Sequence, residues 1–381
     1  MKRSFVAVLV VILAMASLVG MTSRVQAATS SITADAAVLL DARTGTILYG
    51  RSPYERRPPA STTKILTAIV ALEKGYLSDV VTVSPSAAWT EGSSIYLRTG
   101  EKLTLEALLW GALMESGNDA CVAIAEHIAG SEKGFSQLQN AKARALGAWD
   151  THFVNPHGLP DPDHYTSAYD LATIARYSLR NSKFQEIVRS QEQTLKGPEG
   201  SRTFYNTNRL LWSYSGADGV KTGTTAEAGQ CLVASATRAG RQLVAVVLHS
   251  DDRWSDAIAL LDYGFQETRL LNLFQAGEVI GLPLTHGFEA SIPVRVERDL
   301  YLVVDKDAAE RVERVLEVPT LRAPVERGER LGRVVVKLDG KTLAERDLVA
   351  AASAAKRSAL TTFIWYVYRP LVAVLKSWHL L

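Results

Sequence analysis

The sequence predicts a mixed α/β fold of the α+β type, in which a helical segment lies between β-rich segments. Three observations predict it. A strand, turn and strand pattern precedes residue 50, apolar runs of helical length fill much of residues 65–180, and two β-rich runs follow within residues 230–248. The character changes again after about residue 274, where β-formers dominate, which indicates a second, smaller domain.

The first strands and the first helix are predicted by turn and breaker residues. Residues 37–41 and 46–49 are β-forming runs separated by a short turn with glycine, so they predict a hairpin. Two consecutive prolines then precede residues 65–72, which have the length and composition of a buried helix. Ser61 therefore stands at the N-terminus of that helix.

Four further apolar runs predict a mainly helical insertion, namely residues 105–114, 120–128, 138–146 and 167–180. Ser116-Gly117-Asn118 separates the first two of these runs and so lies on a helix connection. Residues 230–237 and 242–248 form a second predicted hairpin. Residues 219–223 precede it, on or beside an edge strand.

The C-terminal part divides into a β-rich domain, residues 274–350, and an apolar tail, residues 351–381. The domain has clear strand patterns but no chemical motif, which indicates a role in spacing or in contact with proteins or the cell wall. In the tail, Thr362, Arg369 and Lys376 are seven residues apart, so a helix would gather them opposite a wide apolar and aromatic face. We expect an amphipathic helix that anchors the chain in the plane of a membrane; a packing helix and a true span are the alternatives.

The N-terminus has the features of a secretory signal. Residues 1–27 combine Lys2-Arg3, an apolar core over 5–21 and the small-residue site Val25-Gln26-Ala27. The expected mature chain begins near residue 28, with a catalytic domain over 28–273; an uncleaved N-terminal anchor is the alternative. Export predicts a location at the outer, periplasmic or extracytoplasmic face of the cytoplasmic membrane.

Composition excludes some classes of function. The chain has 381 residues, of which 47% are apolar, as in globular proteins. The formal charge of +2 does not describe the body of the chain, because the two terminal segments, 1–27 and 351–381, hold seven cations and no acid. The body is therefore acidic, and no nucleic-acid surface is expected. Cys121 and Cys231 are too few for a disulfide scaffold and are predicted to be buried free thiols.

Three short motifs stand in one order along the chain: Ser61-Thr62-Thr63-Lys64, Ser116-Gly117-Asn118 and Lys221-Thr222-Gly223. S-x-x-K, S-D-N and K-T-G together are typical of acylating serine enzymes, here with glycine in place of aspartate. S-x-x-K alone means little, since Ser353 and Lys356 form a second match. The order and the uniqueness of the other two motifs indicate a real site.

The residue types suit acyl transfer. Ser61 needs a base, and Lys64 lies one helical turn away on the same face; burial and a nearby cation such as Lys221 would keep it neutral by lowering its pKa. Ser116 could relay a proton, and Asn118 could orient Lys64 or hold a substrate amide. In the third motif, Lys221 offers a cation for a carboxylate, Thr222 a hydroxyl, and Gly223 room for a substrate backbone.

The residues around these motifs resemble those of the low-molecular-mass penicillin-binding proteins that are D-alanyl-D-alanine carboxypeptidases. The resemblance covers about residues 30–350 and rests on the motifs with their flanks, including Asn155-Pro156-His157-Gly158-Leu159 and Asp218 to Thr225. It implies a penicilloyl-serine-transferase, β-lactamase-like fold: an antiparallel sheet flanked by helices, a helical subdomain and a C-terminal β domain.

By that resemblance, Ser61 attacks the penultimate D-alanine of a peptidoglycan stem pentapeptide, releases the last D-alanine, and water hydrolyses the acyl-enzyme. Penicillins and other β-lactams would be covalent inhibitors. The backbone N–H groups of Ser61 and Thr224 would bind the oxyanion. No cofactor and no metal is implied.

Three other enzyme classes and one non-enzymatic role are the alternatives. A class A β-lactamase should carry Glu-x-x-Leu-Asn, which does not occur here. A zinc peptidase could use the nearby His157, Asp161, Asp163 and His164, but no His-Glu-x-x-His or Glu-x-x-His pattern accompanies them. A D,D-endopeptidase on the same fold stays open. A catalytically silent wall-binding scaffold would be expected to have lost at least one motif residue.

Overall fold

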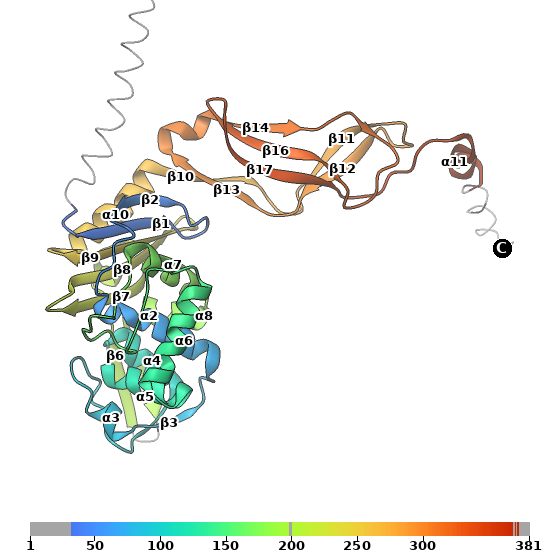
Figure 1. Cartoon of the computed structure of the whole chain (residues 1–381). Coiled ribbons are helices and arrows are strands. Elements are labelled where there is room, and N and C mark those ends of the chain that lie inside the picture. Colours follow the sequence, from blue (N-terminus) through green and yellow to red (C-terminus); the bar gives the residue numbers. More distant parts are fainter. Residues whose placement is uncertain (1–31, 198–199, 369, 371, 373–381) are drawn as a thin grey trace, which may run out of the picture. The chain divides into compact units, whose positions relative to one another are not determined.

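The computed structural model describes residues 32–197, 200–368, 370 and 372 and divides the chain into two compact units between Glu267 and Thr268 (Figure 1). The expected signal peptide, residues 1–27, lies outside the described residues. Each unit has its own hydrophobic core. The mixed α/β class with antiparallel sheets, predicted from sequence, is confirmed.

A five-stranded antiparallel sheet forms the centre of the first unit, in the order β2-β1-β9-β8-β7. Alternating residues of β1, β8 and β9 are buried on opposite faces, so each face builds its own core cluster, as the two-residue period of a strand requires. The predicted hairpins are both present, and β7 is an edge strand. The bounds are β1 (Ala36–Asp41), β2 (Ile47–Arg51), β7 (Ala217–Thr225), β8 (Gly229–Arg238) and β9 (Arg241–Ser250).

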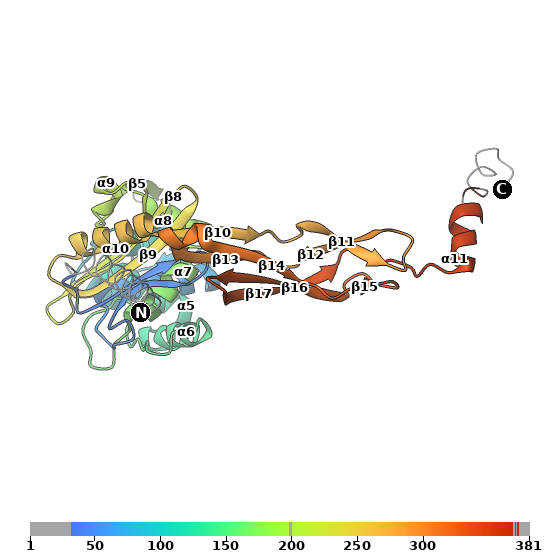
Figure 2. The same ribbon diagram turned by 90° about the horizontal axis from the view of Figure 1, so that it is seen from above.

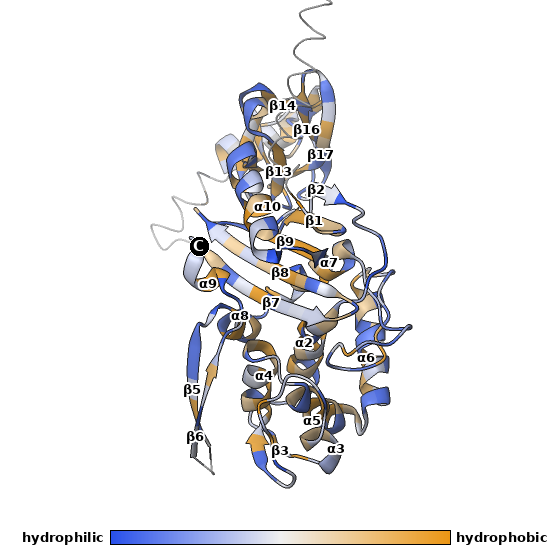
Figure 3. Cartoon of the chain, turned by 90° about the vertical axis from the view of Figure 1, so that its left-hand side faces the viewer, coloured by the Kyte–Doolittle hydropathy of each residue, from blue (hydrophilic) through white to orange (hydrophobic). Residues whose placement is uncertain are grey.

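Helices cover both faces of this sheet. The helix α10 (Arg253–Glu267) packs on one face, and the mainly helical insertion lies on the other, as Figure 1 shows. The central helix, α2 (Lys64–Lys74), is buried over its first eight residues and is surrounded by other helices. In Figure 3 the hydrophobic colours lie mainly on the strands and helices at the centre of this unit. The insertion further contains η1 (Ala60–Thr63), α4 (Leu105–Met114), α5 (Asn118–Ala129), α6 (Glu132–Ala145), α7 (Ala168–Ser178) and α8 (Ser182–Arg189).

Capping residues set several helix starts. The helix α6 begins six residues before the predicted run, because Ser131 Oγ accepts from Gly134 N at 3.1 Å and caps it there. Thr104, Ser167 and Asn181 cap α4, α7 and α8 in the same way. Smaller elements complete the unit: β3 (Val80–Thr82), α3 (Pro85–Ala88), β4 (Lys102–Thr104), β5 (Glu192–Gly197), β6 (Gly200–Tyr205) and α9 (Leu210–Ser213).

The second unit is built of antiparallel strands with one short parallel pairing (Figure 2). It begins at Thr268, six residues before the boundary expected at 273/274, because β10 pairs along its length with β13 of the same unit. One sheet is β10-β13 and the other is β14-β16-β17-β12-β11-β15. The bounds are β10 (Thr268–Phe274), β11 (Val279–Thr285), β12 (Ser291–Val296), β13 (Leu300–Asp305), η2 (Lys306–Arg311), β14 (Val312–Glu317), β15 (Leu321–Arg322), β16 (Arg330–Leu338) and β17 (Lys341–Ala350).

The tail expected from residue 351 becomes helical only at Ala359, because the residues before it still pair with the second unit: Ala354 bridges to Val325 and Lys356 to Gly287. The helix α11 (Ala359–Phe363) continues into a π-helical turn, η3 (Ile364–Tyr368), and most of the predicted anchor beyond it lies outside the described residues. Its exposed large apolar side chains are Leu360, Phe363, Ile364, Tyr366, Val367 and Tyr368. Among the described residues, no helix is long and apolar enough to cross a membrane.

Candidate active site

The first motif lies where the chain enters the helical insertion. Ser61 lies in η1, a short 3₁₀ helix directly before α2, at the helix start that the sequence predicts. The preceding Ala60 has a positive φ of 49°, and Gly158 packs against its carbonyl group. A Cβ atom at position 158 would lie 1.8 Å from Ala60 O, so only glycine fits there. This contact holds the turn that presents the Ser61 hydroxyl.

Lys64 is the centre of a polar network within the core. Its Nζ donates to Ser61 Oγ at 2.8 Å, to Asn118 Oδ1 at 2.7 Å and to the carbonyl oxygen of His157 at 2.7 Å. The side chain is fully buried, and burial lowers the pKa of Lys64 to about 8 despite the nearby Cys121 and Asp119, which favour the charged form. A substantial neutral fraction therefore exists near neutral pH, as a general base requires.

The second motif connects α4 and α5. Ser116 has a positive φ of 66° and is 7% exposed, and in the part of the chain that the structure describes its hydroxyl makes no hydrogen bond. Asn118 begins α5 and bridges two parts of the site, because its Oδ1 accepts from Lys64 while its Nδ2 donates to Glu91 O at 2.6 Å. The amide thus fixes the position of the Lys64 ammonium group.

The third motif lies on the edge strand β7. Lys221 is 1% exposed and donates from Nζ to Thr222 O at 3.0 Å. Thr222 Oγ1 lies 2.8 Å from Thr207 Oγ1. Burial and the nearby Lys64 cation lower the pKa of Lys221 well below its usual range. The pKa of Lys64, in contrast, is lowered by its own burial. A bound carboxylate would restore the Lys221 charge.

The backbone of the third motif closely approaches the turn that holds Ser61. A Cβ atom at Gly223 would lie 3.1 Å from Ser61 N and 3.0 Å from Pro59 O, so a glycine at this position keeps the two backbones adjacent. The structure thereby brings β7 beside the Ser61 N–H. The next residue, Thr224, donates from Oγ1 to Gly223 O at 2.8 Å.

Sequence reasoning missed two residues that hold these elements. Arg253 Nη1 donates to Gly223 O at 2.8 Å, Thr224 Oγ1 at 2.8 Å and Cys231 O at 3.2 Å, which ties the end of β7 to β8. The buried Asp119 accepts from Ser94 Oγ at 2.7 Å and from backbone N–H groups of the loop that precedes β4. Asp119 directly follows the second motif. Arg253 stands 30 residues beyond Gly223 of the third motif and carries no local pattern.

The remaining titratable candidates have structural partners. His164 stacks on Phe153 and lies 2.8 Å from Thr63 Oγ1, and burial lowers its pKa to about 3. His157 Nε2 lies 3.4 Å from Glu132 Oε2. Among the described residues, no group of His, Cys, Asp and Glu is arranged to hold a metal ion.

The two cysteines are free and buried, as predicted. Burial raises the pKa of both thiols, Cys121 and Cys231, to about 11, so neither is a reactive thiolate. Cys121 lies close enough to Lys64 to interact with its charge.

Comparisons with known proteins agree with this geometry. A family model described as D-alanyl-D-alanine carboxypeptidase matches residues 22–252, and one described as penicillin-binding protein 5, C-terminal domain, matches residues 269–356. The chain is 36% identical to the D-alanyl-D-alanine carboxypeptidase DacF of Bacillus subtilis over 343 residues, covering 87% of this chain and 88% of that protein. It is 33% identical to DacA of Escherichia coli over 338 residues, covering 84% and 83%.

A solved structure shares the fold over both units. Penicillin binding protein 5 from Haemophilus influenzae superimposes with a TM-score of 0.74 at 31% identity, covering 86% of this chain and 98% of that one. The penicilloyl-serine-transferase architecture with a C-terminal β domain, expected from the motifs, is thereby confirmed.

Proposed function

This chain belongs to the D-alanyl-D-alanine carboxypeptidase family and is a serine-type D-Ala-D-Ala carboxypeptidase of the penicillin-binding type, and we propose that Ser61 is its acylated residue. The observation that carries the proposal is the hydrogen bond of 2.8 Å from the buried Lys64 Nζ to Ser61 Oγ. A base of lowered pKa in direct contact with a hydroxyl is the arrangement that nucleophilic catalysis needs.

In the proposed reaction, neutral Lys64 takes the Ser61 proton as Oγ attacks the carbonyl carbon of the penultimate D-alanine. The carbon–nitrogen bond then breaks, and the terminal D-alanine leaves with a proton returned from Lys64 through Ser116. Water hydrolyses the ester and regenerates Ser61. The N–H groups of Ser61 and Thr224 bind the oxyanion, a role supported by the close approach of Gly223 to Ser61 N.

The other motif residues bind and orient the substrate. Lys221 pairs with the terminal carboxylate, because a cation buried beside the nucleophile has no described carboxylate partner of its own. Thr222 and Gly223 supply a hydroxyl and room for the peptide backbone, and Asn118 holds Lys64 in place. Penicillins imitate the same acyl donor and trap Ser61.

A matched pair of variants tests the nucleophile. Wild-type protein should remove one D-alanine from a stem pentapeptide, measured by mass spectrometry, and should bind a fluorescent penicillin covalently. Ser61→Ala should lose both properties, whereas Ser353→Ala, which alters the second S-x-x-K match, should keep both. Equal labelling of Ser61→Ala and wild type would disprove the assignment.

We also propose that residues 1–27 are removed on export, that 28–267 are the catalytic domain, and that the tail lies in the outer surface of the cytoplasmic membrane. The exposed apolar and aromatic side chains of α11 and η3 support an interfacial location. Deletion of residues 358–381 should release the protein from membranes, and cell fractionation measures how much of the shortened protein stays in the membrane fraction. Full retention of the shortened protein would refute the anchor.

A further inference from the structure

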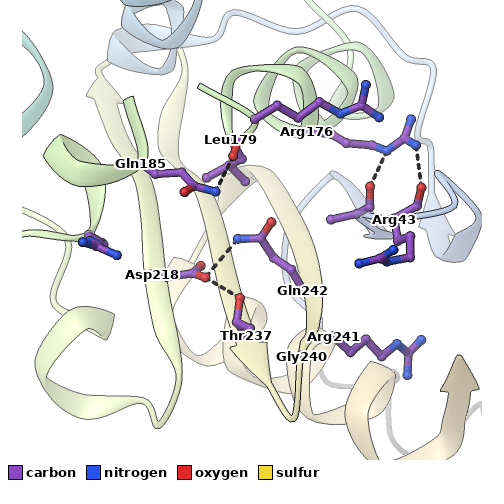
Figure 4. A pocket seen from close by; sticks show the side chains of 12 residues that line it. Arg43, Arg176, Leu179, Gln185, Asp218, Thr237, Gly240, Arg241 and Gln242 are labelled. Atoms are coloured by element: carbon purple, nitrogen blue, oxygen red, sulfur yellow. Dashed lines mark hydrogen bonds between the residues drawn. The ribbon is translucent and has the colours of Figure 1, made fainter. Parts of the chain in front are cut away.

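A cavity of the first unit, outside the proposed active site, is strongly basic. Its volume is about 760 Å³, and it is lined by the β1–β2 turn, α7, α8, the start of β7 and the β8–β9 hairpin (Figure 4). Asp218, at the beginning of β7, precedes Lys221 by three residues, so this cavity lies along the strand from the proposed active site. The arginines that line it are Arg43, Arg176, Arg180, Arg189 and Arg241.

Arg176 is held in place by neutral groups. Its Nε donates to Ala42 O at 2.6 Å and its Nη2 to Arg43 O at 2.9 Å, and both bonds are drawn in Figure 4. A Cβ atom at Gly45 would lie 2.9 Å from Arg176 Nη1, so the guanidinium packs directly on the β1–β2 turn. Backbone carbonyls orient this cation without cancelling its charge. Burial and the nearby Arg180 cation lower the pKa of Arg176.

The carboxylates around the cavity do not balance these charges. Both oxygens of Asp218 already accept hydrogen bonds, from Ser235 Oγ at 2.6 Å, Thr237 Oγ1 at 2.5 Å and Gln242 Nε2 at 2.9 Å. The buried Asp41 pairs with Arg241 Nε at 2.9 Å. Neither Arg180 nor Arg189, both exposed at the cavity, forms an ion pair with any described residue.

We propose that this cavity binds a multiply charged phosphate oxyanion, held by the N–H donors of Arg180 and Arg189. Arg176 adds its positive charge, because its Nε and Nη2 already donate to backbone carbonyls. Guanidinium groups present planar pairs of N–H donors that match phosphate oxygens, and several cations around one space favour a ligand with more than one negative charge. The site is independent of Ser61 chemistry and of the proposed function. Its ligand is either a soluble oligophosphate or the phosphate headgroups of an anionic lipid surface.

Calorimetric titration of the full chain with pyrophosphate and with tripolyphosphate tests the proposal. Saturable binding at one site is expected, weakened at least tenfold in the Arg180→Gln/Arg189→Gln double variant. The matched control, Lys133→Gln/Arg144→Gln, removes the same charge from α6 outside the cavity and should bind like wild type. Penicillin acylation should stay within about twofold of wild type in both variants, which shows that they are folded.

Two results would overturn the site: no saturable binding to wild type at low salt, or equal weakening in the two double variants, which would indicate only non-specific charge attraction. Vesicles of phosphatidylglycerol distinguish the sources when both variants also lack residues 358–381, so that the proposed tail anchor does not bind the vesicles. If lipid headgroups are the ligand, the Arg180→Gln/Arg189→Gln variant binds them less than the control does, and pyrophosphate competes. If vesicle binding is equal in both while pyrophosphate binding differs, the ligand is a soluble phosphate.

Discussion

The pH dependence of Ser61 acylation should follow the protonation of Lys64. Lys64 takes a proton from Ser61 only when it is neutral, and burial places its pKa at about 8 rather than at its ordinary value of 10.5. Acylation should therefore rise with pH and level off above pH 8. The sign follows because lowering the pKa of a base increases its neutral fraction at any pH below that value.

The magnitude can be worked out from that pKa. With a pKa of about 8, the neutral fraction of Lys64 is about 9% at pH 7 and about 91% at pH 9, so the rate should rise about tenfold between them. A lysine with an ordinary pKa would be about 0.03% neutral at pH 7 and about 3% at pH 9, a rise of about a hundredfold. The two cases are easily separated.

The assay is the second-order rate constant for acylation by a fluorescent penicillin from pH 5.5 to 10, which reports ionisations of the free enzyme. A fluorophosphonate is the control reagent, because the same serine attacks its phosphorus and displaces fluoride, while the reagent has no carboxylate for Lys221. Both reagents should show the same rising limb with its midpoint near pH 8. A rate that is flat below pH 8, or that still rises tenfold per unit above pH 9, would refute the role of Lys64.

Three substitutions test the support of the site. Gly158→Ala should destabilise the fold by about 3 kcal/mol or more and slow acylation, because its Cβ would lie 1.8 Å from Ala60 O. Gly100→Ala is the matched control, since Gly100 has a similar positive φ but open space around it. In thermal unfolding this control should lose only about 1 kcal/mol of stability. Asp119→Asn should lower stability by about 2 kcal/mol, since an amide NH₂ would face N–H donors, and an unchanged unfolding midpoint would contradict this. Arg253→Leu should slow acylation about tenfold by releasing the end of β7 and leave thermal stability nearly unchanged; a normal rate would show that this contact is dispensable.

Much of the local structure is predictable from the sequence because its patterns are strong. The hairpins, the helix after Ser61 and the edge position of the third motif all follow from periodicity and breaker residues. The domain boundary is harder to predict from the sequence, because β10 is a strand only through its pairing with β13, about 30 residues later. The apolar pattern also predicts the start of α6 six residues too late, since the first turn of that helix is polar and depends on the Ser131 cap.

The sequence by itself determined which residue types could perform acyl transfer and in what order they stand. Only the tertiary structure decided that Lys64 is buried and bonded to Ser61, that burial lowers the pKa of Lys64, and that Arg253 ties the end of β7 to β8. The physical reason is that desolvation and hydrogen bonding depend on neighbours distant in sequence, which no local pattern encodes. The arginines of the basic cavity are likewise scattered over the chain and come together only when the strands and helices are packed.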